Sequence, residues 1–215
     1  SWMMRKWIPA ILILAAVIIT IAVYPRLPEQ IPTHWSMSGE VNGWSNRLWG
    51  AWMLPFIMAV VWMFMRAIPH IDPRKANYEK FSGMYDALVI LILAFMLLMH
   101  VVVLLSATGN VIRMDRVVMP ATGIFIAIMG VLLPRAQPNW FVGFRTPWTL
   151  TSDLSWERTH KVGGTLFIAL GLLVVASTFI APERAIWLLV VAGLGVVAFL
   201  FIYSYQVWKQ DPSKR

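Results

Sequence analysis

The chain has 215 residues, of which 59% are hydrophobic and only 13% are charged. In an ordinary soluble domain about 25% of the residues are charged, so this composition excludes a typical soluble enzyme. The formal net charge is +8, but no basic soluble domain accompanies it, which argues against nucleic-acid binding. The sequence contains no Cys and therefore has neither disulfides nor thiol chemistry.

The apolar residues form six long blocks rather than alternating patterns. A lipid core requires about 20 consecutive apolar residues per helix, and lipid forces the backbone N–H and C=O groups of a single block to bond internally, as a helix does. We therefore predict an all-α integral membrane protein, a bundle of six transmembrane helices. The predicted spans are Trp7–Tyr24, Trp49–Ala67, Tyr85–Ser106, Val117–Leu133, Thr165–Ile180 and Ala185–Val207.

The basic residues predict the orientation of the bundle. With six spans, most of the 18 Lys and Arg residues fall on the side that carries both termini. Loops on the cytoplasmic side are enriched in Lys and Arg, so we expect cytoplasmic N- and C-termini. The first partner that the sequence predicts is the lipid bilayer, whose anionic headgroups attract such basic flanks.

A long connection follows the first span, at Pro25–Leu48, and is expected on the outer side. Its three Pro residues oppose a helix, and Asn42-Gly43 is a strong signal for a tight turn. We predict a short hairpin here, with Trp35 and Trp44 facing the membrane surface.

The second long connection, Pro134–Lys161, is expected on the inner side. After Pro138 and Pro147, Thr151 or Ser152 can cap a short helix over Asp153–Lys161. We expect that helix to lie at the membrane interface and to end at Gly163-Gly164, before the fifth span begins.

Small residues predict where helices cross closely, because lipid gives apolar faces no reason to associate. The candidates are Gly123, Ala127 and Gly130 on the fourth span, Gly164 and Gly171 on the fifth, and Gly193, Gly195 and Ala198 on the sixth. A three-plus-three inverted repeat, as in many transporters, is an alternative organisation, although the two halves do not match visibly in sequence.

The inner connection resembles the SdpI family of bacterial membrane proteins. The residues that carry the resemblance are Asn139, Gly143, Arg145, Thr146, Pro147, Trp148, Thr149, Leu150, Trp156, Thr159, His160, Gly163 and Gly164. The outer connection is similar to the small domain of unknown function that commonly precedes this family. That similarity rests on Leu27, Pro28, Ile31, Pro32, Thr33, His34, Trp35, Gly39, Glu40, Gly43 and Trp44.

The resemblance implies a multi-span immunity protein of the bacterial cytoplasmic (plasma) membrane. Such a protein would protect against a secreted antimicrobial peptide, or sense it, and relay its state to a cytosolic regulator. The resemblance implies no enzyme activity, no cofactor and no catalytic residue. It also suggests three units: a two-span unit at 1–68, a middle two-span unit at 69–134, and an SdpI-like unit at 135–215.

Arg145 and its neighbours are the predicted partner-binding set. Arg145 lies in a Gly-x-Arg-Thr-Pro-Trp turn between Phe144 and Trp148, where a guanidinium can stack and still donate to an anionic group. The alternative is a structural arginine that binds helix-end carbonyls, Asp153 or Glu157. The full set is Asn139, Gly143, Arg145, Thr146, Pro147, Trp148, Trp156, Glu157, Thr159, His160 and Gly163.

Glu157 and His160 raise the possibility of a metalloenzyme, because positions i and i+3 share a helix face. Zinc sites need three or four ligands, however, and His34 lies on the opposite side of the membrane in the predicted topology. The alternative pairs Glu157 with Lys161 and lets His160 cap carbonyls. We therefore predict no metal.

The outer-connection set is Pro32, His34, Trp35, Gly39, Glu40 and Trp44. Here His34 can sense pH or bind metal, or else it fixes the Pro-rich loop through a hydrogen bond to backbone.

Two polar residues, Asp86 and His100, fall inside the third span. They support a small proton-coupled transporter as an alternative function, whereas an interfacial ion pair at Asp86, on the level of Arg66 and Arg135, is the structural explanation.

Overall fold

The structure is a computed structural model that describes residues 2–215. Within these residues it has six helices that are long and apolar enough to cross a membrane. They are α1 (Trp2–Val23), α2 (Arg47–Ile71), α3 (Ser82–Ala107), α4 (Met114–Leu132), α5 (Asp153–Ile180) and α6 (Ala185–Gln210). The six predicted spans are confirmed as helices, and the protein is a multi-pass helical membrane protein.

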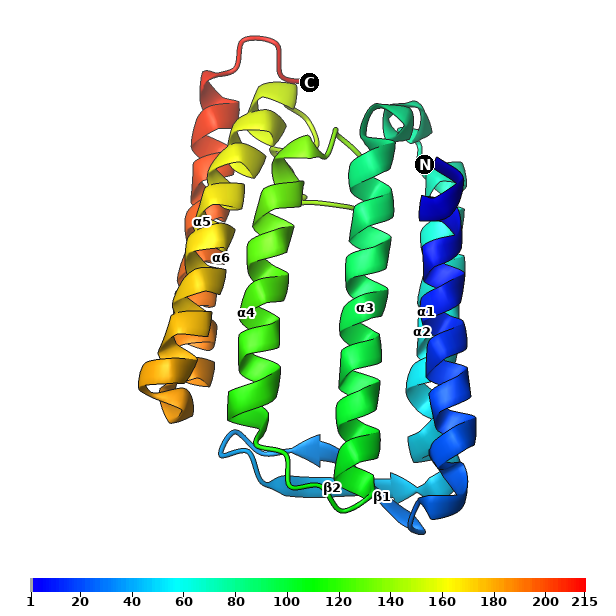
Figure 1. Cartoon of the computed structure of the whole chain (residues 1–215). Helices are drawn as coiled ribbons and strands as arrows, with labels where there is room; N and C mark the ends of the chain where they lie inside the picture. The colour runs from blue at the N-terminus through cyan, green and yellow to red at the C-terminus, as the bar shows by residue number, and fades with distance from the viewer. Residues whose placement is uncertain (1) are drawn as a thin grey trace.

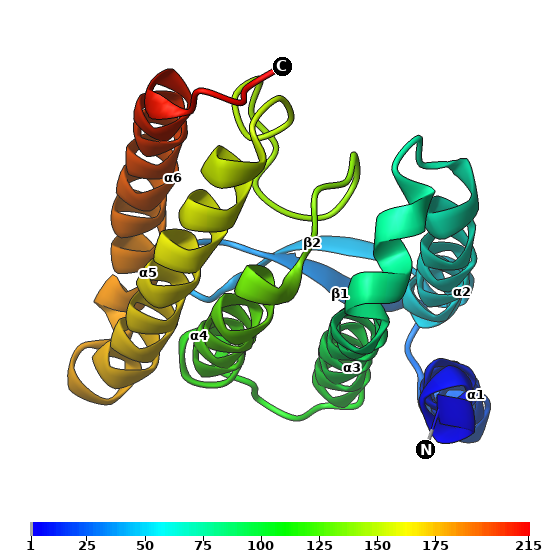
Figure 2. The ribbon, with the colours of Figure 1, turned by 90° about the horizontal axis from the view of Figure 1, so that it is seen from above.

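The helices run alternately up and down and form two groups (Figure 1). Seen from above, α1, α2 and α3 lie on one side, and α4, α5 and α6 lie on the other (Figure 2). Both ends of the chain lie at one end of the bundle, and two β-strands lie at the opposite end (Figure 1). We call these the termini end and the hairpin end.

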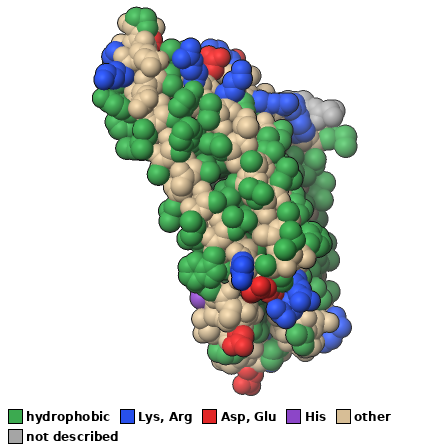
Figure 3. All heavy atoms as spheres, turned by 90° about the vertical axis from the view of Figure 1, so that its left-hand side faces the viewer, with side chains coloured by type: hydrophobic (Ala, Val, Ile, Leu, Met, Phe, Trp, Pro, Cys, Tyr) green, Lys and Arg blue, Asp and Glu red, His purple; other side chains and the backbone are tan. Residues whose placement is uncertain are grey.

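On one side of the bundle, charged side chains lie toward the two ends. In Figure 3 hydrophobic side chains cover the middle of the visible face, and Lys, Arg, Asp and Glu gather toward its two ends. A band without charges is what a hydrocarbon core requires, because a charge at the bilayer centre is costly.

Side chains cap the two helices that follow the long connections. The Oδ1 of Asn46 accepts the N–H of Trp49 at 2.8 Å at the start of α2, and the Oγ of Ser152 accepts the N–H of Ser155 at 3.0 Å at the start of α5. Each bond satisfies one N–H that lacks a partner within the helix. Of the two predicted caps, Thr151 and Ser152, Ser152 is the one that caps α5.

The expectation of a separate short helix ending at Gly163-Gly164 is wrong, because α5 continues through both glycines to Ile180. Because these glycines have no side chain, neighbouring helices can pack closely against α5 at this point. A Cβ on Gly164 would lie 2.6 Å from the carbonyl oxygen of Gly130 in α4. The close neighbour helix holds the backbone helical where the sequence pattern alone indicates a break.

The crossing of α4 and α5 depends on small residues, as predicted. A Cβ on Gly123 would lie 2.7 Å from the carbonyl oxygen of Gly171, and a Cβ on Gly171 would lie 2.9 Å from the Cβ of Ala127. The prediction is wrong for the sixth span. A Cβ on Gly195 would meet nothing within 4 Å, and one on Gly193 would only touch Leu170 at 4.0 Å.

The outer connection forms the predicted hairpin, with β1 (Gln30–Trp35) antiparallel to β2 (Val41–Asn46). Its turn is not at Asn42-Gly43, which lie within β2. The turn spans residues 36–40, where the N–H of Ser36 donates to the carbonyl of Glu40 at 2.7 Å and Gly39 has a φ of 88°. The pairs Gln30–Asn46 and Pro32–Trp44 set a register whose closing turn falls at residues 36–40, earlier than the Asn-Gly signal indicates.

Buried side chains anchor both ends of the first helical group. At the hairpin end, Ile31 of β1 packs with Leu27, Ala51, Val103 and Leu104. At the termini end, a larger cluster joins α2, the 3₁₀ segment η2 (Lys75–Phe81) and α3 to residues 132–156 of the second group. The connection between α4 and α5 is therefore part of the core and not a free loop.

Candidate functional site

The connection at residues 136–152, which we call the signature loop, folds around Asn139 at the termini end. Asn139 is fully buried. Its Oδ1 accepts the N–H groups of Phe141 at 2.9 Å and Val142 at 2.6 Å, and its Nδ2 donates to the carbonyl oxygen of Val142 at 2.8 Å. The side-chain amide of Asn139 thus provides hydrogen-bond partners for backbone groups of a turn that has no regular secondary structure.

Two residues of the α2–α3 connection attach the signature loop to the first helical group. Asp72 is buried, and its Oδ2 accepts the hydroxyl of Tyr78 at 2.6 Å and the N–H of Trp140 at 3.0 Å. The Nδ2 of Asn77 donates to the carbonyl oxygen of Pro138 at 2.7 Å. A buried carboxylate is stable only when such donors surround it, so the loop and this connection support each other.

A histidine of α5 holds the middle of the loop. The Nε2 of His160 accepts the N–H of Phe144 at 2.8 Å, which places the ring proton on Nδ1, where it donates to the carbonyl of Trp156 at 2.6 Å. The Trp156 ring stacks on the imidazole with centroids 4.1 Å apart. Gly143 has a φ of +120°, and a Cβ there would lie 2.5 Å from Nε2. Only glycine fits both the backbone conformation and the space.

Hydroxyl groups connect the loop and the start of α5 to α6 and the C-terminal tail. The Oγ atoms of Thr146 and Ser204 lie 3.0 Å apart, and the Oγ of Ser155 donates to the carbonyl of Ser204 at 2.7 Å. The Oγ of Ser152 donates to Asp211 at 2.6 Å, and this bond holds the pKa of the Asp211 carboxyl below its usual value. The C-terminal tail is therefore bonded to the start of α5 and to the residue before its cap.

Arg145 is exposed and donates to the carbonyl oxygen of Trp140 at 2.8 Å. This contact fits the structural interpretation of Arg145, although the carbonyl belongs to the loop itself and not to a helix end. Asp153, one of the expected partners, instead lies 3.8 Å from Arg74 and 3.1 Å from Arg215. Arg145 keeps further N–H groups that can reach an external acceptor.

The predicted partner-binding residues divide by exposure. The buried members are Asn139, Thr146, Trp156, Thr159, His160 and Gly163. Gly143 and Trp148 are half-buried, and the Trp148 ring lies 4.8 Å from that of Phe201 in α6. Only Arg145, Pro147 and Glu157 are exposed, and Trp140 beside them is 52% exposed. Most of the motif residues therefore build the loop, and these four side chains remain open to a partner.

The expected pairing of Glu157 and His160 on one face does not form a metal site. Glu157 is exposed and His160 is buried, and both ring nitrogens of His160 already hold hydrogen bonds. Within residues 2–215, no group of three or more His, Asp or Glu side chains could hold a metal ion.

The hairpin presents a mixed surface at the opposite end of the bundle. Trp44 is 57% exposed and Glu40 is exposed, whereas Trp35 is half-buried and packs on the cluster below. The Nδ1 of His34 lies 2.5 Å from the Oδ1 of Asn42. His34 therefore joins the two strands through the side chain of Asn42. The predicted hydrogen bond to backbone is replaced by this side-chain contact.

Asp86 and His100 lie in α3 but have separate partners. The Oδ2 of Asp86 is 3.9 Å from the Nε of Arg5 at the termini end, so the interfacial ion pair involves neither Arg66 nor Arg135. His100 is fully buried, and its Nε2 lies 2.7 Å from the Oγ1 of Thr20 in α1. His100 thus joins two helices.

Sequence reasoning missed the contribution of the α2–α3 connection to this site. Asp72-Pro73 is a turn signal a few residues beyond the predicted second span, so a helix end could be predicted there. Nothing local indicates that Asp72 and Tyr78 meet Asn139, which lies 61 residues beyond Tyr78.

Comparison with known proteins matches two parts of the chain to family models. Residues 11–59 match DUF1648, a domain of unknown function, and residues 135–204 match the SdpI/YfhL protein family. The first region contains most of α1, the hairpin and the first half of α2. The second contains the signature loop, α5 and most of α6.

Two proteins of Bacillus subtilis (strain 168) are similar to this chain. "Immunity protein SdpI" is 24% identical over 208 residues, which cover 96% of this chain and 98% of that protein. "Uncharacterized membrane protein YbgB" is 31% identical over 96 residues, which cover 44% of this chain and 85% of that protein. No solved structure matches the chain.

Proposed function

Because this chain belongs to the SdpI/YfhL protein family, we propose that it is a non-enzymatic immunity protein or receptor of the bacterial plasma membrane. In this proposal it protects against, or senses, a secreted membrane-active peptide. The observation that carries the proposal is the similarity to an immunity protein along nearly the whole length of both chains.

The proposal places the termini end in the cytoplasm and the hairpin outside. The excess of Lys and Arg on the side of the termini supports this orientation. A secreted peptide then meets the hairpin before it reaches the lipid core.

The surface of the hairpin suits a membrane-active peptide. Trp44 and Met37 are 57% and 54% exposed. In the proposed orientation they face the outer membrane surface, where an amphipathic peptide places its apolar face. The bond between His34 and Asn42 joins the strands, so this surface is formed before a ligand arrives and loses little conformational entropy on binding.

The test is survival of a sensitive bacterium that expresses the chain and is challenged with candidate killing peptides. Wild type should protect, Trp44→Ala should reduce protection, and Trp187→Ala should not. Trp187 is a matched control because it is 56% exposed, lies in the first turn of α6 and is not part of the hairpin. Failure of wild type to protect against any peptide, or equal loss in both variants, argues against the proposal.

A relay to a cytosolic regulator would use the signature loop. The loop is bonded to Asp72 of the first helical group and to Ser204 of α6, so a shift between the two groups would move the exposed Arg145. A photo-crosslinker at position 145 should then give a product that changes on peptide treatment, whereas one at Lys209 should not. If the crosslinked product at position 145 is the same with and without the peptide, the relay hypothesis is excluded.

A proton-coupled transporter using Asp86 and His100 is a weaker candidate. The two residues are about 21 Å apart along α3, and His100 is sealed against Thr20 with no exposed surface. The transporter predicts a proton-dependent flux in liposomes that Asp86→Asn abolishes. A membrane metalloenzyme is weaker still, because neither ring nitrogen of His160 is available as a ligand.

A further inference from the structure

The hairpin has unpaired strand edges. Its sheet contains only β1 and β2, so each strand has a single neighbour. In an antiparallel pair every second residue directs its N–H and C=O groups away from the partner strand, and a row of such groups can pair with a further strand. The strands lie across the end of the bundle (Figure 1). In the proposed orientation the edges of the sheet therefore lie at the outer surface.

The strand β1 is protected against further pairing. It packs against α2 and α3, where Ile31 is fully buried beside Ala51 and Leu104. It also contains Pro32, which has no N–H to donate, and proline is one of the residues that keep edge strands from pairing with other chains.

The strand β2 lacks these protections. Its sequence, Val-Asn-Gly-Trp-Ser-Asn, contains no Pro and no charged residue. Its Trp44, Ser45 and Asn46 pair with β1 in one register. Within residues 2–215, the backbone of residues 41–45 has no hydrogen bond outside the ladder with β1. An uncharged edge of this kind is a template for strand addition.

Opposite charges flank β2. The exposed Glu40 precedes the strand, and Arg47 follows it. The Nε of Arg47 donates to the carbonyl oxygen of Pro28 at 3.3 Å, which leaves further N–H groups of its guanidinium for an acceptor. An antiparallel strand beside β2 begins near Arg47 and ends near Glu40, and it passes Trp44, which is 57% exposed. The edge therefore fits an extended segment with an acidic residue first, a basic residue last and apolar residues between them.

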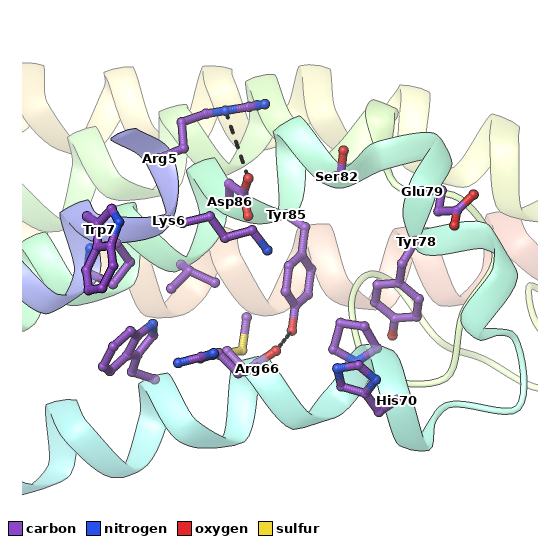
Figure 4. A pocket seen from close by; sticks show the side chains of 15 residues that line it. Arg5, Lys6, Trp7, Arg66, His70, Tyr78, Glu79, Ser82, Tyr85 and Asp86 are labelled. Carbon is purple, nitrogen blue, oxygen red and sulfur yellow. Dashed lines mark hydrogen bonds and ion pairs between the residues drawn. The ribbon is translucent and has the colours of Figure 1, made fainter. Parts of the chain in front are cut away.

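A cavity at the termini end does not compete for this ligand. It has a volume of about 560 Å³ and opens between α1, α2 and α3, with Arg66, Tyr85 and Asp86 among its lining residues (Figure 4). In the proposed orientation this cavity lies on the cytoplasmic side. A peptide that arrives from outside therefore reaches the strand edge first.

We propose that the free edge of β2 binds an extended peptide segment as a third, antiparallel strand. Main-chain hydrogen bonds supply affinity, and Trp44 with the two flanking charges determines which segment binds. The inference rests on the proposed function for the identity of the peptide, which is then the secreted membrane-active one. It rests on the hairpin alone for the mode of binding.

The experiment measures amide hydrogen exchange of the purified chain in a neutral detergent by nuclear magnetic resonance. The probe is the acetylated synthetic peptide amide Glu-Val-Thr-Val-Thr-Val-Thr-Lys. It should slow exchange at the β2 amides that point away from β1 and leave the amides bonded to β1 unchanged. An analogue with an N-methyl group on every Val and Thr keeps the side chains and charges but cannot donate, and it should have no effect.

Charge variants test the direction of the added strand. The reversed peptide Lys-Val-Thr-Val-Thr-Val-Thr-Glu should bind about 2- to 30-fold more weakly, because it loses two opposite-charge pairs across the strands. Glu40→Gln should weaken binding of the first peptide by about 1.4- to 5-fold, because it removes one such pair. The matched control is Glu29→Gln, which removes an exposed carboxylate that lies before β1 and should leave binding as in wild type.

Three results would overturn the inference. Unchanged exchange in β2, or equal slowing by the N-methylated analogue, would exclude strand addition by a peptide. Slow exchange at the same amides without peptide, increasing with protein concentration, would assign the edge to a second copy of this chain. Equal binding of both peptide directions would show that the flanking charges are not used. None of these measurements involves killing, so a failed survival test with the expected exchange pattern refutes the immunity function alone.

Discussion

Replacing Gly143 with alanine tests whether the signature loop depends on its contact with His160. Gly39 offers a matched control, because both glycines have positive φ, 120° and 88°. They differ in their surroundings. A Cβ on Gly39 meets nothing within 4 Å, whereas a Cβ on Gly143 would lie 2.5 Å from His160 Nε2 and 3.1 Å from the Trp156 ring.

The expected magnitudes follow from these surroundings. Gly39→Ala adds backbone strain alone, about 1–3 kcal/mol of lost stability. Gly143→Ala adds the same strain and also displaces the imidazole, which leaves the N–H of Phe144 without its acceptor at 2.8 Å. An unsatisfied donor of this kind costs about 1–3 kcal/mol more. The difference between the two variants corresponds to about 5- to 150-fold in the unfolding equilibrium.

The assay is unfolding of the detergent-solubilised protein by sodium dodecyl sulfate, followed by tryptophan fluorescence. A double-mutant cycle adds the decisive comparison. In a His160→Ala background the imidazole is absent, so Gly143→Ala should cost no more than Gly39→Ala does in wild type. If Gly143→Ala is no more damaging than Gly39→Ala in the wild-type background, contact with His160 is not what requires glycine there.

Three further predictions concern the packing around this site. Gly171→Val should lower stability by about 1–3 kcal/mol by separating α4 from α5, whereas Gly195→Val, with open space around it, should be nearly neutral in a thermal unfolding assay. Asp72→Ala should leave the buried donors that surround it without an acceptor, lower stability by about 2–4 kcal/mol and speed amide exchange in the signature loop. The bond from Ser152 lowers the pKa of Asp211, so its stabilisation is present above the ordinary Asp value and lost as pH falls below it. C-terminal proteolysis should therefore rise at acidic pH in wild type, and Asp211→Asn should remove that pH dependence.

Hydropathy and local capping rules predicted the parts of this fold that depend on the bilayer or on near neighbours. The six spans follow from apolar block length, and the Ser152 cap follows from one hydroxyl and an N–H three residues later. The close crossing at Gly123 and Gly171 also follows, because helices approach in lipid where side chains are smallest. Each of these signals lies within one helix or one pair of helices.

The predictions that failed concern how one segment pairs or packs with another, and they include the close crossing expected at Gly193 and Gly195 of α6. Gly163-Gly164 indicates a helix end, but the neighbouring α4 keeps α5 continuous there. Asn42-Gly43 indicates a turn, but the pairing of β1 with β2 places both residues within a strand and the turn at residues 36–40. The bond between Asp72 and the N–H of Trp140 joins groups 68 residues apart, and no local pattern can indicate it.

The buried positions of the motif residues change what the family resemblance can imply for recognition. Asn139, Trp156 and His160 are almost fully buried and bond backbone groups of the loop or of α5, so their presence predicts the shape of the loop and not its ligand. Recognition must then depend on exposed side chains such as Arg145 and, at the other end, Trp44. Under the proposed function, exchanging exposed hairpin residues between relatives should change which peptide is recognised, whereas exchanging the buried motif residues should change only stability.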